Sequence, residues 1–184
     1  MIYYNHPLKE VFDMKKTYIY DTVCELIDKY GTRNPFQLME SLNIQLFHSS
    51  LSTPKGYSII SYGIGYAAVS DTLDSYERRI VGAHELGHLI LHADKLKVAA
   101  FRDWDLYKSN DKTEYEANLF AAELLLSDEE VVELAEMEQS DYFSMASILC
   151  VSPELLAFKL FGMAQRGFHY NVPSNIDSGF LGNK

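Results

Sequence analysis

The sequence has little cysteine and no long run of apolar residues. Cys24 and Cys150 are the two cysteines among 184 residues, and each lies in an apolar stretch of helical character. We therefore expect two reduced core thiols rather than a disulfide framework, which favours the cytoplasm. No stretch approaches the roughly 18 apolar residues that a membrane-spanning helix needs, and the first ten residues lack the pattern of a secretory signal.

Basic side chains are also scarce, because 16 Lys and Arg stand against 26 Asp and Glu, for a formal net charge of -10. This charge disfavours direct binding to nucleic acid or to an anionic membrane surface. A basic protein partner is easier to accommodate. With 47% hydrophobic residues, a chain of this length can build one buried core.

The first half of the chain predicts short helices followed by short strands. A helix over residues 21–30 ends at Gly31, and a second helix begins with Asn34 as its cap and Pro35 in its first turn. Stretches rich in β-branched and aromatic residues, separated by Gly and Pro, then predict three strands. These strands cover residues 44–48, 57–61 and 64–70.

The second half predicts mainly helices. Asp74 and Glu77 have capping-box spacing at the head of a helix that runs to about His92 and should be the most buried one. Residues 93–112 lack a clear period and are expected to form a functional loop. Further helices are expected over residues 113–126, after the Ser127 to Glu130 capping box, around 145–149 and after Ser152-Pro153.

This order of elements predicts an α+β fold with a small antiparallel or mixed sheet packed on the long helix. We expect a core over residues 1–126, of which 1–16 form an arm. A helical C-terminal extension over residues 127–166 should pack on that core, followed by a loosely ordered tail over 167–184.

The segment His84-Glu85-Leu86-Gly87-His88 carries the chemistry. Two imidazoles four positions apart on a helix share one face and can converge on one zinc ion. Glu85 lies about 100° around the helix. Its carboxylate can therefore reach the water that the metal activates, as a general base must.

A catalytic zinc site needs a third protein ligand and an open position. The best candidate is Glu114, which precedes a strongly apolar helical stretch, and Asn118 one turn later can accept the second N–H of a zinc-bound histidine. Glu116 is the next candidate, although we expect it to cap the helix. Asp94 is a weaker alternative, because Leu91 favours continuing the helix where a turn back would be required. His92, one turn after His88, is expected to be a helix-end group or to support a ligand and not to bind the metal itself.

These residues resemble the ImmA/IrrE family of metallopeptidases, whose pattern is His-Glu-x-x-His followed by Glu-x-x-Ala-Asn-x-Phe-Ala and Leu-Leu. The matching segments here are 84–88, 114–121 and 124–125, and the chain departs from many relatives in having Leu126-Ser127 where they have Met-Pro. The resemblance implies a zincin-like fold with a thermolysin-like core, a zinc ion and cytoplasmic cleavage of a helix-turn-helix repressor. It also implies that Glu114 is the third ligand, with Asn118 supporting a histidine.

Several further expectations concern the surroundings of the site. A donor for the oxyanion of the reaction could come from Tyr62, Tyr66, Tyr107 or His92. The strand over residues 64–70 could be an open edge on which an extended substrate adds as a strand, with a covered edge strand as the equal alternative. Gly82 and Gly87 would be explained by a strand or substrate backbone passing close to the helix. The acidic segment 128–141 is expected to be a solvated helix face, with a docking surface for a basic partner as the alternative.

The sequence therefore predicts a zinc metallopeptidase that cuts a protein substrate, in a switch of a mobile element or stress response. The alternative is a zinc-bound regulatory module that docks a repressor without efficient cleavage. A purely structural zinc site would leave the acid between the two histidines unexplained.

Overall fold

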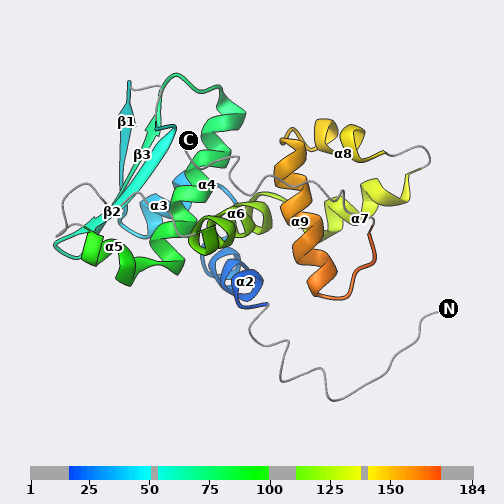
Figure 1. Ribbon diagram of the computed structural model, residues 1–184, viewed down its shortest axis with the longest axis horizontal. Coiled ribbons are helices and arrows are strands. Elements are labelled where there is room, and N and C mark those ends of the chain that lie inside the picture. Colours follow the sequence, from blue (N-terminus) through cyan, green and yellow to red (C-terminus); the bar gives the residue numbers. More distant parts are fainter. Residues whose placement is uncertain (1–16, 51–53, 100–110, 138–140, 171–184) are drawn as a thin grey trace, which may run out of the picture.

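The computed structural model describes residues 17–50, 54–99, 111–137 and 141–170 (Figure 1). A three-stranded sheet lies at one end of the molecule, and helices α7, α8 and α9 lie at the other, with α4 and α6 between them. Outside the described residues lie the expected arm (1–16), residues 100–110 of the expected loop, and the tail beyond residue 170.

The two N-terminal helices begin and end close to where local signals predict. Helix α2 spans Tyr18–Tyr30 and ends at Gly31, whose φ of 67° is the left-handed conformation that glycine adopts readily. Helix α3 spans Pro35–Ser41, and the Asn34 side chain accepts hydrogen bonds from the backbone N–H groups of Phe36 and Gln37. These caps satisfy amide groups that the first turn leaves without helical partners.

The sheet is mixed, as the α+β prediction allows. Strands β1 (Gln45–Ser49), β2 (Gly56–Ser61) and β3 (Ile64–Ser70) are ordered β1-β3-β2, with β1 parallel and β2 antiparallel to β3. Strand β3 is therefore central, and the prediction that it is an open edge is wrong. Its central place is consistent with the burial of three consecutive residues, Ala67, Ala68 and Val69.

One face of the sheet packs on α4 and the other faces outward. Ala67 of β3 and Ile60 of β2 join the main cluster of buried residues, which also includes Ala83 and Leu86 of α4. Side chains alternate along a strand, so Tyr66 points to the opposite face. There its ring stacks on that of Phe47, with 6.0 Å between the ring centroids.

Helix α4 spans Ser75–Leu91 and is capped by Asp74, which accepts from the backbone N–H groups of Tyr76 and Glu77. The predicted cap is confirmed. The short helix α5 follows over Ala93–Ala99, so the first part of the expected loop is helical instead. Helix α6 spans Asp111–Leu125 and starts earlier than predicted, which places Glu116 inside the helix and not at its cap.

Two glycines of α4 make room for aromatic rings of neighbouring helices, and one of them, Gly87, lets α4 and α6 pack closely. A Cβ at Gly87 would lie 3.1 Å from the nearest ring carbon of Phe120 on α6, and one at Gly82 would lie 2.7 Å from the ring of Phe36. The partners are side chains of other helices, not the strand or substrate backbone that we expected. Gly87 and Phe120 thus form a knob-in-hole contact between the two helices.

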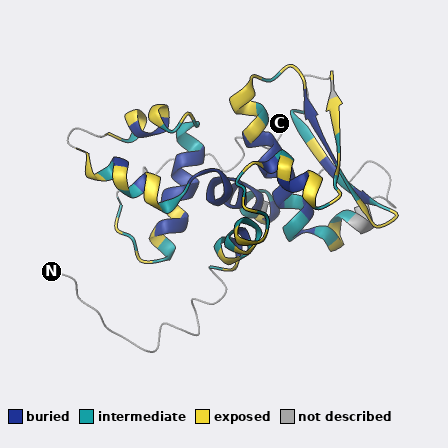
Figure 2. Ribbon diagram, turned by 180° about the vertical axis from the view of Figure 1, so that it is seen from behind, coloured by how far each residue is buried: buried dark blue, intermediate teal, exposed yellow. Residues whose placement is uncertain are grey.

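A second cluster of buried residues lies among the C-terminal helices. Helices α7 (Asp128–Glu136), α8 (Tyr142–Ile148) and α9 (Pro153–Gln165) bury Val131, Met145 and Leu156 together, while α9 also contributes Leu155 and Phe158 to the main cluster. Helix α9 therefore connects the two clusters. Figure 2 shows the buried residues running through the middle of the molecule, along α6 and α9.

Both described cysteines are free, yet only Cys24 lies within a helix. Cys150 is exposed in the turn between α8 and α9, with a φ of 53°, so its expected place in the core is wrong. No single helix within the described residues is long and apolar enough to cross a membrane, although α8 and α9, bent by 105°, meet the length and composition together.

Replacing Gly87 with Val tests the contact between α4 and α6. The added methyl groups meet the ring of Phe120, so the free energy of unfolding should fall by about 1–3 kcal/mol in urea denaturation. The same side chain introduced at the exposed Ala164 of α9 should change it by less than about 1 kcal/mol. Equal effects at the two positions would mean that Phe120 adapts without cost.

Candidate metal centre

Helix α4 carries two histidines on the face that it turns toward α6. His84 is buried and His88 is half-buried, and their Nε2 atoms lie 3.0 Å apart. Their separation of four residues puts the rings one above the other on the helix. The rings meet edge to face, with 4.6 Å between their centroids, so the two nitrogens point at the same space.

Glu114 of α6 faces both imidazoles. Its Oε2 atom lies 3.4 Å from His84 Nε2, and its Oε1 atom lies 3.3 Å from His88 Nε2. One ligand atom from each of the three residues falls within 4.8 Å of the others, which is a spacing that can hold a metal ion. The structure thus brings together the three residues that we predicted as metal ligands.

Asn118 supports one of these histidines from the next turn of α6. Its Oδ1 atom lies 2.8 Å from His84 Nδ1, and the asparagine is fully buried. Since a carbonyl oxygen only accepts, this contact requires an N–H at Nδ1, and Nε2 is the ring nitrogen that faces Glu114. The arrangement is the one that we predicted for Asn118.

Charge lowers the pKa of Glu114. Burial raises it, but hydrogen bonds from His84 and His88 and their positive charge outweigh burial, so the pKa lies well below its usual range. The carboxylate is therefore ionised at any pH near neutrality, which is the form that a metal ligand needs.

Glu85 has the opposite environment. It is buried, and burial raises the pKa of its carboxyl to about 7, against the opposing effects of the His88 charge and a hydrogen bond from Ser58, while Glu114 adds to the rise. A carboxyl group with a pKa near neutrality can both take and return a proton.

The start of β2 makes room for the Glu85 side chain, which the sequence did not lead us to expect. A Cβ at Gly56 would lie 2.8 Å from Glu85 Oε1 and 2.5 Å from a methyl carbon of Val81. Ser58, two residues further along the strand, is buried and contacts the same carboxyl. The small residues Gly56 and Ser58, which alternate along the strand and therefore share one face, were the available signal.

The alternative third ligands lie elsewhere. Glu116 faces His92, with 3.6 Å between Oε2 and Nε2, and also pairs with Lys112. His92 Nε2 lies 3.3 Å from the carbonyl oxygen of Thr113, so this pair joins the end of α4 to the start of α6. Asp94 is exposed on α5. Burial and the charge of His88 lower the pKa of His92, while the nearby Glu116 opposes this shift.

Two of the predicted oxyanion donors are misplaced. Tyr62 is fully exposed in the turn that ends β2, at the opposite end of the strand from Gly56, and Tyr66 lies on the outer face of the sheet. Both choices were wrong, because strand order and the facing of each side chain depend on long-range pairing. His92 remains next to His88, with ring centroids 5.6 Å apart, and Tyr107 lies outside the described residues.

The family model and the curated relatives that this chain matches agree with this geometry. Residues 39–161 match the family model of Peptidase M78, described as the IrrE N-terminal-like domain. The chain is 37% identical over 113 residues to the uncharacterized immunity region protein 2 of Bacillus phage phi105, an alignment that covers 61% of this chain and 70% of that protein. It is 28% identical over 107 residues to metallopeptidase ImmA of Bacillus subtilis (strain 168), covering 58% and 62% of the two chains. No solved structure gives a significant match.

The resemblance that the motifs indicated is therefore confirmed, and so is the zincin-like fold with its small sheet. The family model spans more than half of the chain and includes both the histidine pair and Glu114. This protein belongs to the Peptidase M78 family of metallopeptidases.

Proposed function

We propose that this protein is a zinc-dependent endopeptidase that hydrolyses a peptide bond in a helix-turn-helix repressor in the cytoplasm. The observation that supports it is the convergence of His84, His88 and Glu114, with the buried Glu85 carboxyl on the same helix. Two imidazoles and one carboxylate are the ligand set of many catalytic zinc sites, which keep a fourth position open.

The residues fit a bound zinc ion. The Nε2 atoms of two neighbouring histidines approach to 3.0 Å while a carboxylate lies within 3.4 Å of one of them, so three electron-pair donors face one point. Asn118 already holds the remaining N–H of His84. A zinc ion bound there would act as a Lewis acid on the scissile carbonyl and would make the attacking water more acidic.

Glu85 supplies the acid–base chemistry in this proposal. It takes a proton from the attacking water and returns it to the leaving amine, because its pKa of about 7 suits both directions of transfer. The hydrogen bond from Ser58 orients its carboxyl. Burying the Glu85 carboxyl beside the metal-binding cluster is energetically unfavourable. A module that only docks a repressor would not need this group, so its burial argues against that alternative.

The proposed substrate follows from charge and from the relatives. The net charge of -10 suits a basic DNA-binding protein as partner, and the exposed acidic residues Glu129, Glu130 and Glu133 of α7 can contribute to that attraction. The relative from phage phi105 is named an immunity region protein, which places that protein in a region of a mobile element. A repressor encoded beside this protein is therefore the substrate to test.

Replacing Glu85 with Gln should abolish cleavage of that repressor while zinc remains bound at equal stoichiometry. Loss of the general base should slow turnover by about 10²–10⁴-fold. Mass spectrometry of the repressor after incubation measures the single expected cut, and Glu77→Gln, at an exposed position of the same helix, should leave it unchanged. Cleavage at the wild-type rate by Glu85→Gln would refute the role of this residue, and no cut with wild-type protein would favour the docking module.

Replacing Glu114 with Ala should remove most of the bound zinc, because only two protein ligands remain. Elemental analysis of the purified variant measures the zinc content. Glu116→Ala, two residues away and paired with His92, should retain zinc at the wild-type level. The reverse result would move the third ligand to Glu116.

Replacing Asn118 with Ala should weaken zinc binding by about 10–100-fold, because the Nδ1–H group of His84 loses its buried acceptor. Competition with a chromophoric chelator measures the dissociation constant. Asn118→Asp keeps an acceptor oxygen and should bind zinc more tightly than Asn118→Ala. An unchanged dissociation constant in Asn118→Ala would show that the contact does not tune the site.

A further inference from the structure

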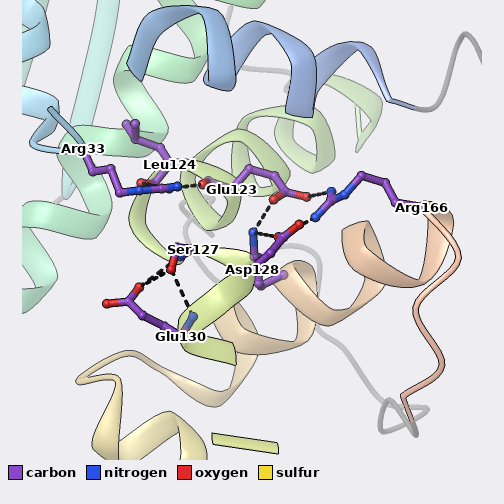
Figure 3. Close-up of polar contacts among 8 residues, drawn as sticks. Arg33, Glu123, Leu124, Ser127, Asp128, Glu130 and Arg166 are labelled. Carbon is purple, nitrogen blue, oxygen red and sulfur yellow. Dashed lines mark hydrogen bonds and ion pairs between the residues drawn. The ribbon is translucent and has the colours of Figure 1, made fainter. Parts of the chain in front are cut away.

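Four charged side chains form a closed group at the C-terminal end of α6. Lys159 Nζ donates to Glu123 Oε2 at 2.6 Å and lies 2.6 Å from Asp128 Oδ1. Arg166 donates to Glu123 as well, and to Asp128 Oδ1 at 2.7 Å (Figure 3). We call Glu123, Asp128, Lys159 and Arg166 the ion-pair ring. Its two acids and two bases give it no net charge.

The ring is buried where α6 meets α9. The side chains of Lys159 and Glu123 are each 1% exposed. A Cβ at Gly162 of α9 would overlap the Glu123 carboxylate, so the helix has an opening for that group. Burial raises the pKa of Asp128, but the hydrogen bond and charge of Lys159 outweigh it, and the net shift is downward. A buried charge without its partner is costly, so the four groups stay together while α6 and α9 are packed.

A second contact fixes the same end of α6. The Arg33 guanidinium donates from Nη1 to the backbone carbonyl oxygens of Glu123 and Leu124, at 3.0 and 3.1 Å. These carbonyls belong to the last turn of the helix, where no intrahelical donor follows. Together with the ring, this contact ties the C-terminal end of α6 both to the segment before α3 and to α9.

Glu114 and Glu123 are on the same helix, nine residues apart. By helix geometry they are separated by about 13 Å along the axis and by about half a turn around it, so they lie on opposite faces. Helix α6 is thus held by α9 on one face, while the other face presents Glu114 to His84 and His88. A rotation of the helix about its axis would carry Glu114 away from the imidazoles.

Apolar packing, including the contact of Phe120 with Gly87, limits such a rotation, but the hydrophobic effect itself is not directional. Charge-assisted hydrogen bonds are short and directional, and buried polar groups can define the register of packed helices at little gain in stability. The ion-pair ring therefore serves mainly to define how α6 is positioned against α9, and contributes less to the free energy of unfolding.

We propose that the ion-pair ring positions the metal ligand Glu114, with Lys159 and Arg166 of the C-terminal helical part acting through α6. The C-terminal helices are then part of the scaffold of the metal centre. This inference rests on the proposed function only in that it needs Glu114 to be a metal ligand.

The test uses Co²⁺ as the probe of the metal centre in the full-length, metal-free protein. Glu123→Met with Lys159→Met removes one acid and one base, keeps the volume and leaves the Asp128 to Arg166 pair. We expect this double variant to unfold cooperatively in urea, but to bind Co²⁺ about tenfold more weakly and with an altered visible absorption band, because Glu114 is less well held.

Two controls separate positioning from other effects. Lys29→Met with Glu40→Met makes the same replacements at exposed positions of α2 and α3 and should leave Co²⁺ binding and the absorption band unchanged. Arg166→Lys keeps the charge but loses the fork that joins Glu123 to Asp128, and should weaken Co²⁺ binding in the same direction as the double variant. It remains informative if the double variant does not fold.

The outcomes distinguish this inference from the proposed function. Wild-type affinity and an unchanged band in the folded double variant, or in Arg166→Lys if the double variant does not fold, would overturn the role of the ring alone. If the wild-type protein binds no Co²⁺, both proposals fall. If the ring variants lose Co²⁺ but wild-type protein cuts no repressor, the ring proposal stands and the proposed peptidase function fails.

Discussion

The meeting of one carboxylate with two imidazoles across the interface of α4 and α6 is the constraint on which the rest of the structure depends. Glu114 lies 3.3–3.4 Å from His84 and His88, and this distance requires the two helices to approach closely. Gly87 allows the approach by leaving space for Phe120. The sheet, packed on the other side of α4, then keeps that helix from moving away from α6.

Two carboxyl groups of this site differ in pKa because their neighbours differ, although both are removed from water. Glu114 faces two imidazoles, whose hydrogen bonds and charge more than offset the effect of burial. Glu85 has a weaker set of opposing contacts, and burial raises its pKa to about 7. Opposite pKa shifts of two neighbouring acids are typical of a site in which one carboxylate stays ionised while the other can exchange a proton.

The sequence predicted the features that are encoded within a few residues of chain. The caps Asp74, Asn34 and Ser127 are all confirmed, since a cap is a contact between neighbours in sequence. The order of the strands was not predictable, because pairing joins segments that are far apart in the chain. For the same reason Tyr62 and Tyr66 were wrongly considered as donors. Glu116 was wrongly taken for a cap because α6 begins earlier than the local signals indicate, at Asp111.

Glu123 and Lys159 show a different limit of sequence reasoning. Each is a single charged residue within an apolar stretch, Ala121 to Leu126 and Leu155 to Phe161, and a lone charge in such a stretch is costly unless it is paired. Two such residues of opposite sign predict a buried pair. The sequence does not say which helix faces which, and therefore not that the pair fixes the end of the helix that carries Glu114. Only the packing of α9 on α6 shows that Lys159 pairs with Glu123 at the C-terminal end of α6. This packing connects the C-terminal helices to the helix that carries Glu114 at its other end.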